Sequence, residues 1–441
     1  MKKFFFCILF VANLAIITFL WLATSGNTLL TNPTIDIVYI VFSRIAGLLA
    51  VYFTLLQFLI IGRVKWLERT FGFDKLSTAH YWIGVIAFTF IVLHLLLLLA
   101  GYSLIYKATW WQQFVDFNTS WEELFPATVS VFLFIVVIIS SISITKKMLK
   151  YELWYYVHLI SYLAVLLAFG HQLEIGYDLR TNSIFSTYWI LLYVFVIINF
   201  IFYRFLWQFY IFYKHKFYIS KVQKETVDTV SIYIKGTNIQ NFIYKPGQFV
   251  ILRFLTTNLI FQAHPYSISS LPNSKYIRIT IKSLGDFSSK IKNIAIGTKV
   301  LIDGPNGIFT KKENQGNKIL FIAGGIGITP IRTLIEELLT EKKNIVLLYA
   351  VKSQNEIIFK KELELIEQKN KDNFKIKYII KDKENADFNT IDENCIKILV
   401  PDVATREVYL CGPILMSKTM KKYLINLKTN KNKIYYEKFS F

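Results

Sequence analysis

Long apolar runs fill the first half of the chain and give way to alternating patterns in the second half. The apolar runs cover residues 4–23, 36–61, 79–101, 127–145, 154–171 and 188–213. Each is close to the ~20 residues that a helix needs to cross a bilayer. The pattern therefore predicts six transmembrane helices within residues 1–213, embedded in a lipid bilayer. Because the first run lacks a clear small-residue cleavage site, we interpret it as a retained helix and not as a signal peptide.

An alternation of apolar and polar positions begins after residue 214. Segments such as TVSIYIK (229–235) and YIRITIK (276–282) have the period of two that is typical of strands. We expect residues 214–312 to form a small antiparallel β-barrel. From residue 318, apolar strands such as KILFIAGG alternate with helical segments such as TPIRTLIEELL. Residues 313–441 are therefore expected to form a parallel α/β nucleotide-binding domain.

The basic residues indicate how the predicted helices are oriented. The formal net charge is +20, and eleven of the basic residues flank the helices on one side: Lys2, Lys3, Arg63, Lys65, Arg69, Lys75, Lys146, Lys147, Lys150, Lys214 and Lys216. The other side carries Lys107 and Arg180. The positive-inside rule then places the N-terminus and the second half on the cytoplasmic side of the cell (inner) membrane. Since no basic helix is interleaved with stacking aromatics, nucleic acid is not an expected partner.

Four of the six histidines lie in two of the predicted transmembrane helices. The third helix contains His80 and His94, and the fifth contains His158 and His171. If both helices run outward, His80 and His158 lie near the inner side, and His94 and His171 near the outer side. The helical rise separates the two levels by ~20 Å. Imidazoles paired at two depths are what two stacked haems b require, so we predict these histidines as ligands of two haem irons.

Two other interpretations of these histidines remain open. A single membrane histidine is as often a hydrogen-bond donor between helices, and a proton relay would need accompanying carboxylates that the region lacks. The two histidine pairs also differ in their spacing along the chain. Fourteen residues at about 100° each return to within about 40° of the same helix face, but thirteen leave a mismatch of about 140°. We expect Gly170 to let the helix change its winding before His171.

Arg44 is the other intramembrane charge, in the outer half of the second predicted helix. A charge at this depth is costly and suggests a functional role. We expect Arg44 to pair with a propionate of the outer haem. The alternative is that the side chain reaches the membrane interface without a specific partner.

Two segments of the predicted barrel have the composition of a cofactor site. HPYSISS (264–270) can pack Tyr266 on a flat ring system and use Ser267 to hydrogen-bond its polar edge. KSLGDFSSKI (282–291) places Ser288 and Ser289 at a predicted helix start, where free N–H groups suit a pyrophosphate.

The loop AGGIGITPI (323–331) joins the first strand of the α/β domain to its first helix. Glycines at 324, 325 and 327 would let the backbone approach a phosphate, with Thr329 as N-cap and Pro330 at the first helical position. The loop is not the G-x-G-x-x-G fingerprint, because Pro330 stands where the third glycine would be. Lys352 follows the second strand and could meet a ribose 2′-phosphate, which favours NADPH over NADH. Glu356 lies close enough to leave that preference open.

The order of these motifs resembles the NADPH oxidase and ferric reductase superfamily, in its prokaryotic form. The four histidines, HPYSISS, LGDFSS, GPNG, AGGIGITP, YLCGP and the terminal EKFSF carry the resemblance, which covers nearly the whole chain. The second half by itself resembles the ferredoxin–NADP reductase fold. The chain departs from the family pattern at Asn306, where an aromatic is frequent, and at Tyr266 and Ser267, where Phe and Thr are common.

The resemblance implies roles for individual residues. FAD would be held by His264, Pro265, Tyr266 and Ser267 at the flavin and by Gly285, Ser288 and Ser289 at the pyrophosphate. The nicotinamide nucleotide would meet Gly325, Gly327, Thr329 and Lys352, with Cys411 and Gly412 beside the nicotinamide. Phe441 matches a terminal aromatic that stacks on the flavin. We group Phe441, Cys411 and Arg44 as the residues expected nearest to the reacting groups.

The expected activity is that of an NAD(P)H oxidoreductase working across a membrane. NAD(P)H would reduce FAD, the inner and outer haems would carry single electrons, and an external acceptor would receive them. Dioxygen, giving superoxide, is the first choice of acceptor, and a ferric chelate is the second. The chain could instead donate electrons to a membrane or periplasmic protein, although no protein partner is required. The simplest alternative is a flavin reductase anchored by passive helices.

Overall fold

The computed structural model describes residues 2–142, 148, 151–257, 259–312, 316–382 and 388–438. Phe441 and the loop lysines Lys146, Lys147 and Lys150 lie outside the described residues. The chain divides into two compact units. The first contains residues 1–71 and 75–203, and the second contains residues 72–74 and 204–441. Each unit is described by itself.

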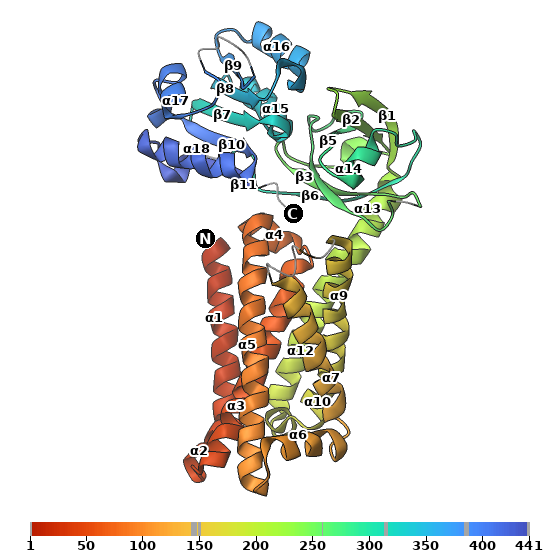
Figure 1. The fold of residues 1–441 in the computed structure, drawn as a ribbon, viewed down its shortest axis with the longest axis vertical. Coiled ribbons are helices and arrows are strands. Elements are labelled where there is room, and N and C mark those ends of the chain that lie inside the picture. The colour runs from red at the N-terminus through yellow and green to blue at the C-terminus, as the bar shows by residue number, and fades with distance from the viewer. Residues whose placement is uncertain are drawn as a thin grey trace. The chain divides into compact units, whose positions relative to one another are not determined.

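The first unit is a bundle of helices (Figure 1). Its α-helices are α1 (Lys2–Trp21), α2 (Asn27–Thr31), α3 (Ile35–Ile61), α4 (Lys65–Phe71), α5 (Phe73–Tyr106), α6 (Trp110–Thr119), α7 (Leu124–Ser141), α9 (Tyr151–Leu167), α10 (Phe169–Glu174), α11 (Tyr177–Thr181) and α12 (Ser183–Ile201). Short π-helical turns, η1 (Leu22–Gly26) and η2 (Phe202–Leu206), follow α1 and α12. Six helical stretches of the described chain are long and apolar enough to cross a membrane. The prediction of six transmembrane helices is confirmed.

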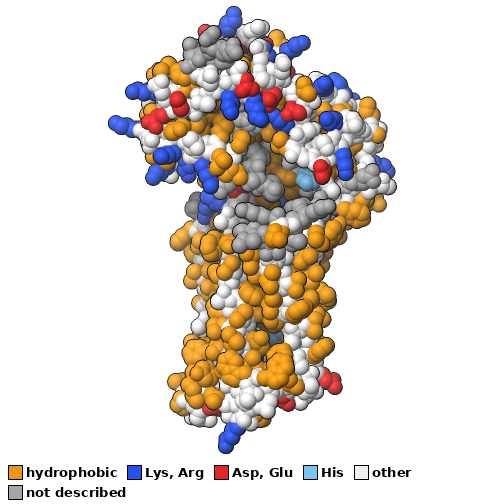
Figure 2. Space-filling view, in the orientation of Figure 1, with side chains coloured by type: hydrophobic (Ala, Val, Ile, Leu, Met, Phe, Trp, Pro, Cys, Tyr) orange, Lys and Arg blue, Asp and Glu red, His pale blue; other side chains and the backbone are white. Residues whose placement is uncertain are grey.

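The surface of this unit suits lipid. Large apolar side chains such as Leu96, Phe132, Leu166 and Ile198 are exposed along its length. Figure 2 shows hydrophobic side chains covering most of the visible face of the bundle. Exposed apolar area on this scale is unfavourable in water and favourable in a bilayer. The chain is therefore a multi-pass membrane protein.

The first part of the second unit, up to residue 312, contains two antiparallel sheets. One has the order β1 (Tyr218–Lys224), β2 (Thr229–Lys235), β5 (Ile277–Lys282), and the other has the order β4 (His264–Ser267), β3 (Phe249–Phe254), β6 (Val300–Asn306). Helix α13 (Trp207–His215) precedes them, and α14 (Asp286–Ile291) lies between β5 and β6.

The expectation of a small antiparallel β-domain at residues 214–312 is confirmed, but its described strands form two open sheets and not one closed barrel. Among the described residues, the edges of the two sheets are linked by isolated bridges, Tyr218 with Lys299 and Ile268 with Ile279. Register shifts in the β1–β2 and β3–β6 ladders also bend the strands. A shared core, which includes Phe217, Phe254 and Ile279, holds the sheets together instead of a continuous ladder.

The remaining chain forms a five-stranded parallel sheet covered by helices on both faces. Its order is β11 (Ile434–Lys438), β10 (Glu407–Gly412), β7 (Lys318–Gly324), β8 (Asn344–Val351), β9 (Phe374–Ile380). The helices are α15 (Ile328–Thr340), α16 (Lys360–Lys369), α17 (Glu393–Leu399) and α18 (Ile414–Asn426). Two apolar cores, one on each face, pack these helices onto the sheet. The prediction of a parallel α/β domain is confirmed. The strand order reverses between β7 and β10, where such sheets bind ligands beyond their carboxyl ends.

Candidate functional site

The structure brings His80 and His158 together. His80 is on α5 and His158 is on α9, and their ring centroids are 5.9 Å apart with the planes inclined by 64°. Gln57 on α3 donates its side-chain N–H to the His80 carbonyl oxygen at 2.8 Å. The hydroxyl of Ser141 lies 3.3 Å from Nδ1 of His158. These contacts hold both imidazoles at one level of the bundle.

His94 and His171 line one cavity, together with Arg44. The cavity has a volume of about 490 Å³ and is walled mainly by apolar side chains such as Leu98, Val131 and Phe134. Pockets of roughly 300–1,000 Å³ with apolar walls and few polar groups are typical of cofactor sites. His94 and His171 therefore share an apolar cavity within the first unit.

The helical segment that carries His158 and His171 is interrupted between the two histidines. Helix α9 ends at Leu167 and α10 begins at Phe169, with Ala168 between them at φ −77° and ψ −10°. The regular turn of about 100° per residue therefore does not run unbroken from His158 to His171. The break lies at Ala168, two residues before the glycine on which we expected it to depend. Gly170 itself lies inside α10, and a Cβ there would meet nothing within 4 Å.

His94 is held by α3 through contacts that sequence reasoning missed. Its Nδ1 atom lies 2.8 Å from the Ser43 carbonyl oxygen and 3.0 Å from the Ser43 hydroxyl. A carbonyl oxygen only accepts, so Nδ1 carries the proton and Nε2 is left with its lone pair for a metal. One turn further along α3, a Cβ on Gly47 would come within 2.8 Å of the same ring nitrogen. The S-x-x-x-G spacing, which puts both residues on one helix face, was the available signal.

Arg44 faces the protein interior and not the lipid. Its guanidinium donates to the Ser25 hydroxyl at 3.1 Å and lies 4.2 Å from the ring centroid of Tyr177. Asp178, which is buried, accepts hydrogen bonds from the Ser25 backbone N–H at 3.1 Å and from the hydroxyl of Thr24. Arg44 thus has a fixed place in the wall of the cavity that His94 and His171 line.

The HPYS segment forms strand β4. It pairs with β3, so that Tyr266 lies opposite Val250 and Ser267 opposite Phe249. Burial raises the pKa of Tyr266, which therefore remains a neutral phenol. The ring of His264 lies 4.0 Å from that of Phe287 on α14. This contact connects the two segments expected to hold FAD.

At the start of α14, the serines satisfy nearby backbone groups. Ser288 Oγ accepts from the backbone N–H groups of Leu284 at 2.9 Å and Gly285 at 3.0 Å. The Ser289 hydroxyl donates to the Asp286 carbonyl at 2.9 Å. Gly285 is open to its surroundings, with nothing within 4 Å of a Cβ position.

The AGGIGITPI loop lies at the carboxyl end of β7. Gly325 has φ +52°, in the left-handed region that glycine favours. A Cβ on Gly327 would lie 2.1 Å from the carbonyl oxygen of Cys411, at the end of β10 next to Gly412. Tyr349 of β8 donates its hydroxyl proton to the Gly325 carbonyl at 3.1 Å, a contact that the sequence did not reveal.

Thr329 is not the N-cap that we expected. The helix begins at Ile328, so Thr329 and Pro330 both lie in its first turn. The Thr329 hydroxyl donates to the Ile326 carbonyl at 2.9 Å. The 3₁₀ turn at Gly325–Gly327 leads directly into the helix, which therefore begins earlier in the sequence than we expected.

Lys352 is exposed directly after β8, while Glu356 is engaged elsewhere. The Glu356 carboxylate accepts from Lys282 Nζ at 2.8 Å, and Asp228 is 3.2 Å from the same nitrogen. Burial alone would lower the pKa of Lys282, but its hydrogen bonds to Glu356 and Asp228 raise it. Lys352 is therefore better placed than Glu356 to meet a ribose substituent.

Three family models match successive parts of the chain. Residues 46–169 match the ferric reductase like transmembrane component, residues 214–312 an FAD-binding domain, and residues 321–422 an oxidoreductase NAD-binding domain. The order of the three matches is that of a ferric reductase or NADPH oxidase-like architecture. The chain thus carries a ferric reductase like membrane domain followed by an FAD-binding domain and an oxidoreductase NAD-binding domain.

Curated relatives match about half of the chain. A glycine betaine monooxygenase reductase subunit of Chromohalobacter salexigens is 28% identical over 48% of this chain and 60% of its own length. Flavohemoprotein B of Dictyostelium discoideum is 27% identical over 51% of this chain and 59% of its own length. The chain thus spans about 60% of these relatives. The FAD/NAD-binding domain of nitric oxide dioxygenase from Vibrio cholerae matches 50% of this chain and 96% of that domain, at 22% identity and a TM-score of 0.46.

Proposed function

We propose that the chain transfers electrons across the cell (inner) membrane from cytoplasmic NAD(P)H, through FAD and two haems b, to an external acceptor. The observation that carries the proposal is the pairing of the four histidines. The imidazole rings of His80 and His158 are in contact, and His94 and His171 share one apolar cavity. Bis-imidazole haem needs two histidines per iron, because the macrocycle supplies the other ligands.

The side chains around these histidines fit a haem. The Nδ1–H of His94 is bound by Ser43, which leaves its Nε2 available. Among the described residues, Nδ1 of His80 and Nδ1 of His171 are buried without a hydrogen-bond partner, and no group of three or more metal-binding side chains gathers elsewhere. Arg44, on the wall of the outer cavity, would place a positive charge near a propionate. When bound, FAD accepts hydride and haem iron passes single electrons.

The FAD and nucleotide segments supply the reducing end. In the proposed arrangement, β4 and the α14 start orient the flavin. The glycine turn after β7 receives the nucleotide at the carboxyl edge of the sheet, and Lys352 offers a cation to a 2′-phosphate, so we propose NADPH as the preferred donor. The excess of basic loop residues around the N-terminus supports a cytoplasmic side for both termini.

We propose dioxygen as the acceptor, reduced to superoxide. The walls of the cavity proposed for the outer haem are mainly apolar, so a small neutral molecule would reach the haem edge more readily than a charged chelate. Ferric-chelate reduction is the second candidate, supported by the match of residues 46–169 to the ferric reductase like component. Donation to a partner protein would use the same electron path.

The test is a pair of assays on purified, FAD-loaded and haem-loaded protein. With NADPH in air, superoxide-dismutase-sensitive cytochrome c reduction should exceed ferric-chelate reduction. If chelate is reduced equally fast under anaerobiosis and no superoxide forms in air, the oxidase choice is wrong. If the protein binds FAD but gives no Soret band under haem-replete conditions, the proposed electron transfer through haems is wrong.

A further inference from the structure

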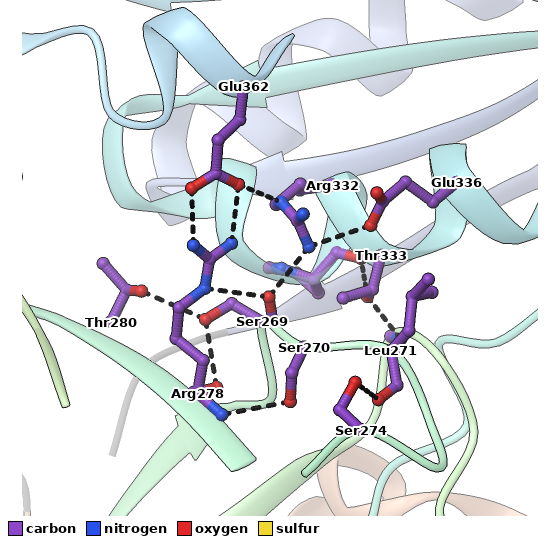
Figure 3. A network of polar contacts seen from close by, with 12 residues as sticks. Ser269, Ser270, Leu271, Ser274, Arg278, Thr280, Arg332, Thr333, Glu336 and Glu362 are labelled. Carbon is purple, nitrogen blue, oxygen red and sulfur yellow. Dashed lines mark hydrogen bonds and ion pairs between the residues drawn. The ribbon is translucent and has the colours of Figure 1, made fainter. Parts of the chain in front are cut away.

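A network of charged side chains joins the FAD-binding part of the second unit to its nucleotide-binding part (Figure 3). Arg278 on β5 makes a bidentate pair with Glu362 on α16, with Nη1–Oε1 and Nη2–Oε2 distances of 2.6 and 3.0 Å. Arg332 on α15 donates its Nε–H to Glu362 Oε2 at 2.8 Å. One carboxylate therefore binds a guanidinium from each side of the interface.

Both guanidiniums also reach the same backbone atom. The Ser269 carbonyl oxygen accepts from Nε of Arg278 at 3.1 Å and from Nη1 of Arg332 at 3.0 Å. Ser269 lies two residues after Ser267, within the HPYSISS segment. Arg332 lies three residues after Thr329 on the helix that the AGGIGITPI loop begins. A single carbonyl thus connects the segment proposed for the flavin with the helix that bears the nucleotide loop.

The aromatic ring of Phe359 packs against both guanidiniums of the network. Its ring centroid lies 4.4 Å from Cζ of Arg278 and 5.9 Å from Cζ of Arg332. Phe359 is buried, with φ +59° and ψ +24°, a left-handed conformation that is unusual for a bulky residue. Such backbone strain persists only where the surroundings impose it, and it clusters at functional sites.

The burial of these charges indicates a geometric role. The side chains of Arg278 and Arg332 are 5% and 12% exposed, and that of Glu362 is 34% exposed. Buried ion pairs add little net stability, because desolvation offsets their attraction, but a fully bonded arrangement permits one geometry. Bidentate arginine–carboxylate pairs are directional, which a pair of point charges is not.

We propose that Arg278, Glu362 and Arg332 are positioning residues that fix the distance between the nucleotide loop and the flavin segment for hydride transfer. The inference rests on the flavin and nucleotide sites of the proposed function. In that step the C4–H bond of the dihydronicotinamide breaks, and the hydride with its electron pair passes to FAD, which is reduced as the nicotinamide is oxidised. Reacting atoms must approach to about 3–3.5 Å, and a misplacement of about 1 Å can slow a reaction about 100-fold.

The test uses the full-length, FAD-loaded protein and the variant Glu362→Gln, with NADPH mixed under anaerobiosis. We expect flavin reduction to slow by about 10- to 100-fold, while the dissociation constant for NADPH changes by less than about threefold. The long-wavelength charge-transfer absorbance of nicotinamide stacked on flavin should be lost, which a general stability defect would not produce selectively. Glu362→Asp, which keeps the charge, should recover part of both signals.

The matched control is Glu364→Gln on the same helix. Glu364 pairs with Lys360 at 3.9 Å on the exposed face, and both side chains are about 40% exposed. This variant should reduce its flavin at the wild-type rate.

Wild-type kinetics and a full charge-transfer band in Glu362→Gln would overturn the positioning role. If Glu362→Gln releases FAD or does not fold, the rate of flavin reduction is measured in Arg332→Lys instead. Lysine keeps the charge but lacks the planar guanidinium that bonds both Glu362 and Ser269. An unchanged rate in Arg332→Lys would then overturn it. Failure of NADPH to reduce the FAD of the wild-type protein would instead overturn the proposed function.

Discussion

Nδ1 of His94 lies 2.8 Å from the backbone carbonyl oxygen of Ser43 on the neighbouring helix. Because the acceptor is main chain, no substitution at position 43 removes it, and the imidazole keeps its tautomer whatever the side chain there. The contact also increases the electron-donating character of the other ring nitrogen. The orientation of this proposed iron ligand is therefore built into α3.

Gly47→Ala should disturb this ligand directly. The new Cβ would lie 2.8 Å from His94 Nδ1, which is too close for a carbon–nitrogen contact, so the ring or the helix must move. We expect about half of the haem to be lost or the outer haem potential to shift, measured by haem-to-protein ratio and redox titration. Gly170→Ala is the control, because a Cβ there meets nothing within 4 Å. Equal haem content and potentials in both variants would contradict the prediction.

His94→Ala should separate the two ends of the electron path. The outer level loses one imidazole, while the inner pair and the second unit are untouched. We expect one haem per chain instead of two, with NADPH-dependent flavin reduction at the wild-type rate and external acceptor reduction abolished. Two retained haems would show that His94 is not an iron ligand.

Lys352→Ala should weaken binding of NADPH but not of NADH. The lysine is exposed at the end of β8, and loss of one charge contact to a phosphate typically costs about tenfold in affinity. The ratio of KM values for the two nucleotides, measured by flavin reduction, reports the change. Lys361→Ala on α16, another exposed lysine, is the control. A parallel rise in both KM values would instead indicate a general role in nucleotide binding.

The ion network should make the second unit sensitive to acid. Burial alone would raise the pKa of Glu362, but its hydrogen bonds to Arg278 and Arg332 hold it below the ordinary value of 4.5. A lowered folded-state pKa contributes stability above pH 4.5 that is lost as the pH falls through the lower folded value. Thermal unfolding should therefore show a drop in Tm in acid that is smaller in Glu362→Gln.

The pKa of Glu336, which also pairs with Arg332, is shifted in the direction opposite to that of Glu362. Burial raises its pKa although Arg332 opposes the shift, so its protonation in acid favours the folded state. The carboxylate of Glu362 also raises the pKa of Glu336, so the difference between wild type and Glu362→Gln reports Glu362 together with its effect on Glu336. Identical acid profiles of the two proteins would rule out a stabilising carboxylate at position 362.

Periodicity predicted the elements that depend on local sequence. Runs of about 20 apolar residues became the membrane-crossing helices, and the alternation around KILFIAGG became the parallel sheet. The openness of the FAD-domain sheets could not be predicted, because it depends on which strand edges meet, such as Ile268 with Ile279. The position of the break at Ala168 also escaped, since alanine has high intrinsic helix propensity and gives no local sign of an interruption.

The polar contacts of the candidate sites escaped for a related reason. Arg278 and Glu362 are 84 residues apart, and Ser43 and His94 are 51 apart. No motif couples such positions, and each residue alone resembles an ordinary strand or helix residue. The sequence indicated which segments carry chemistry, but the partners of their side chains required the tertiary structure.

At the proposed nucleotide site, the close approach of Gly327 to the Cys411 carbonyl would affect how fast nucleotides exchange. Two backbone segments in direct contact form a cradle whose shape exists before any ligand arrives. A nucleotide bound there would order no loop, so little affinity would be lost to entropy, and its departure would need no unfolding step. A preformed site of this kind would suit a protein that must bind a new NAD(P)H at each turnover.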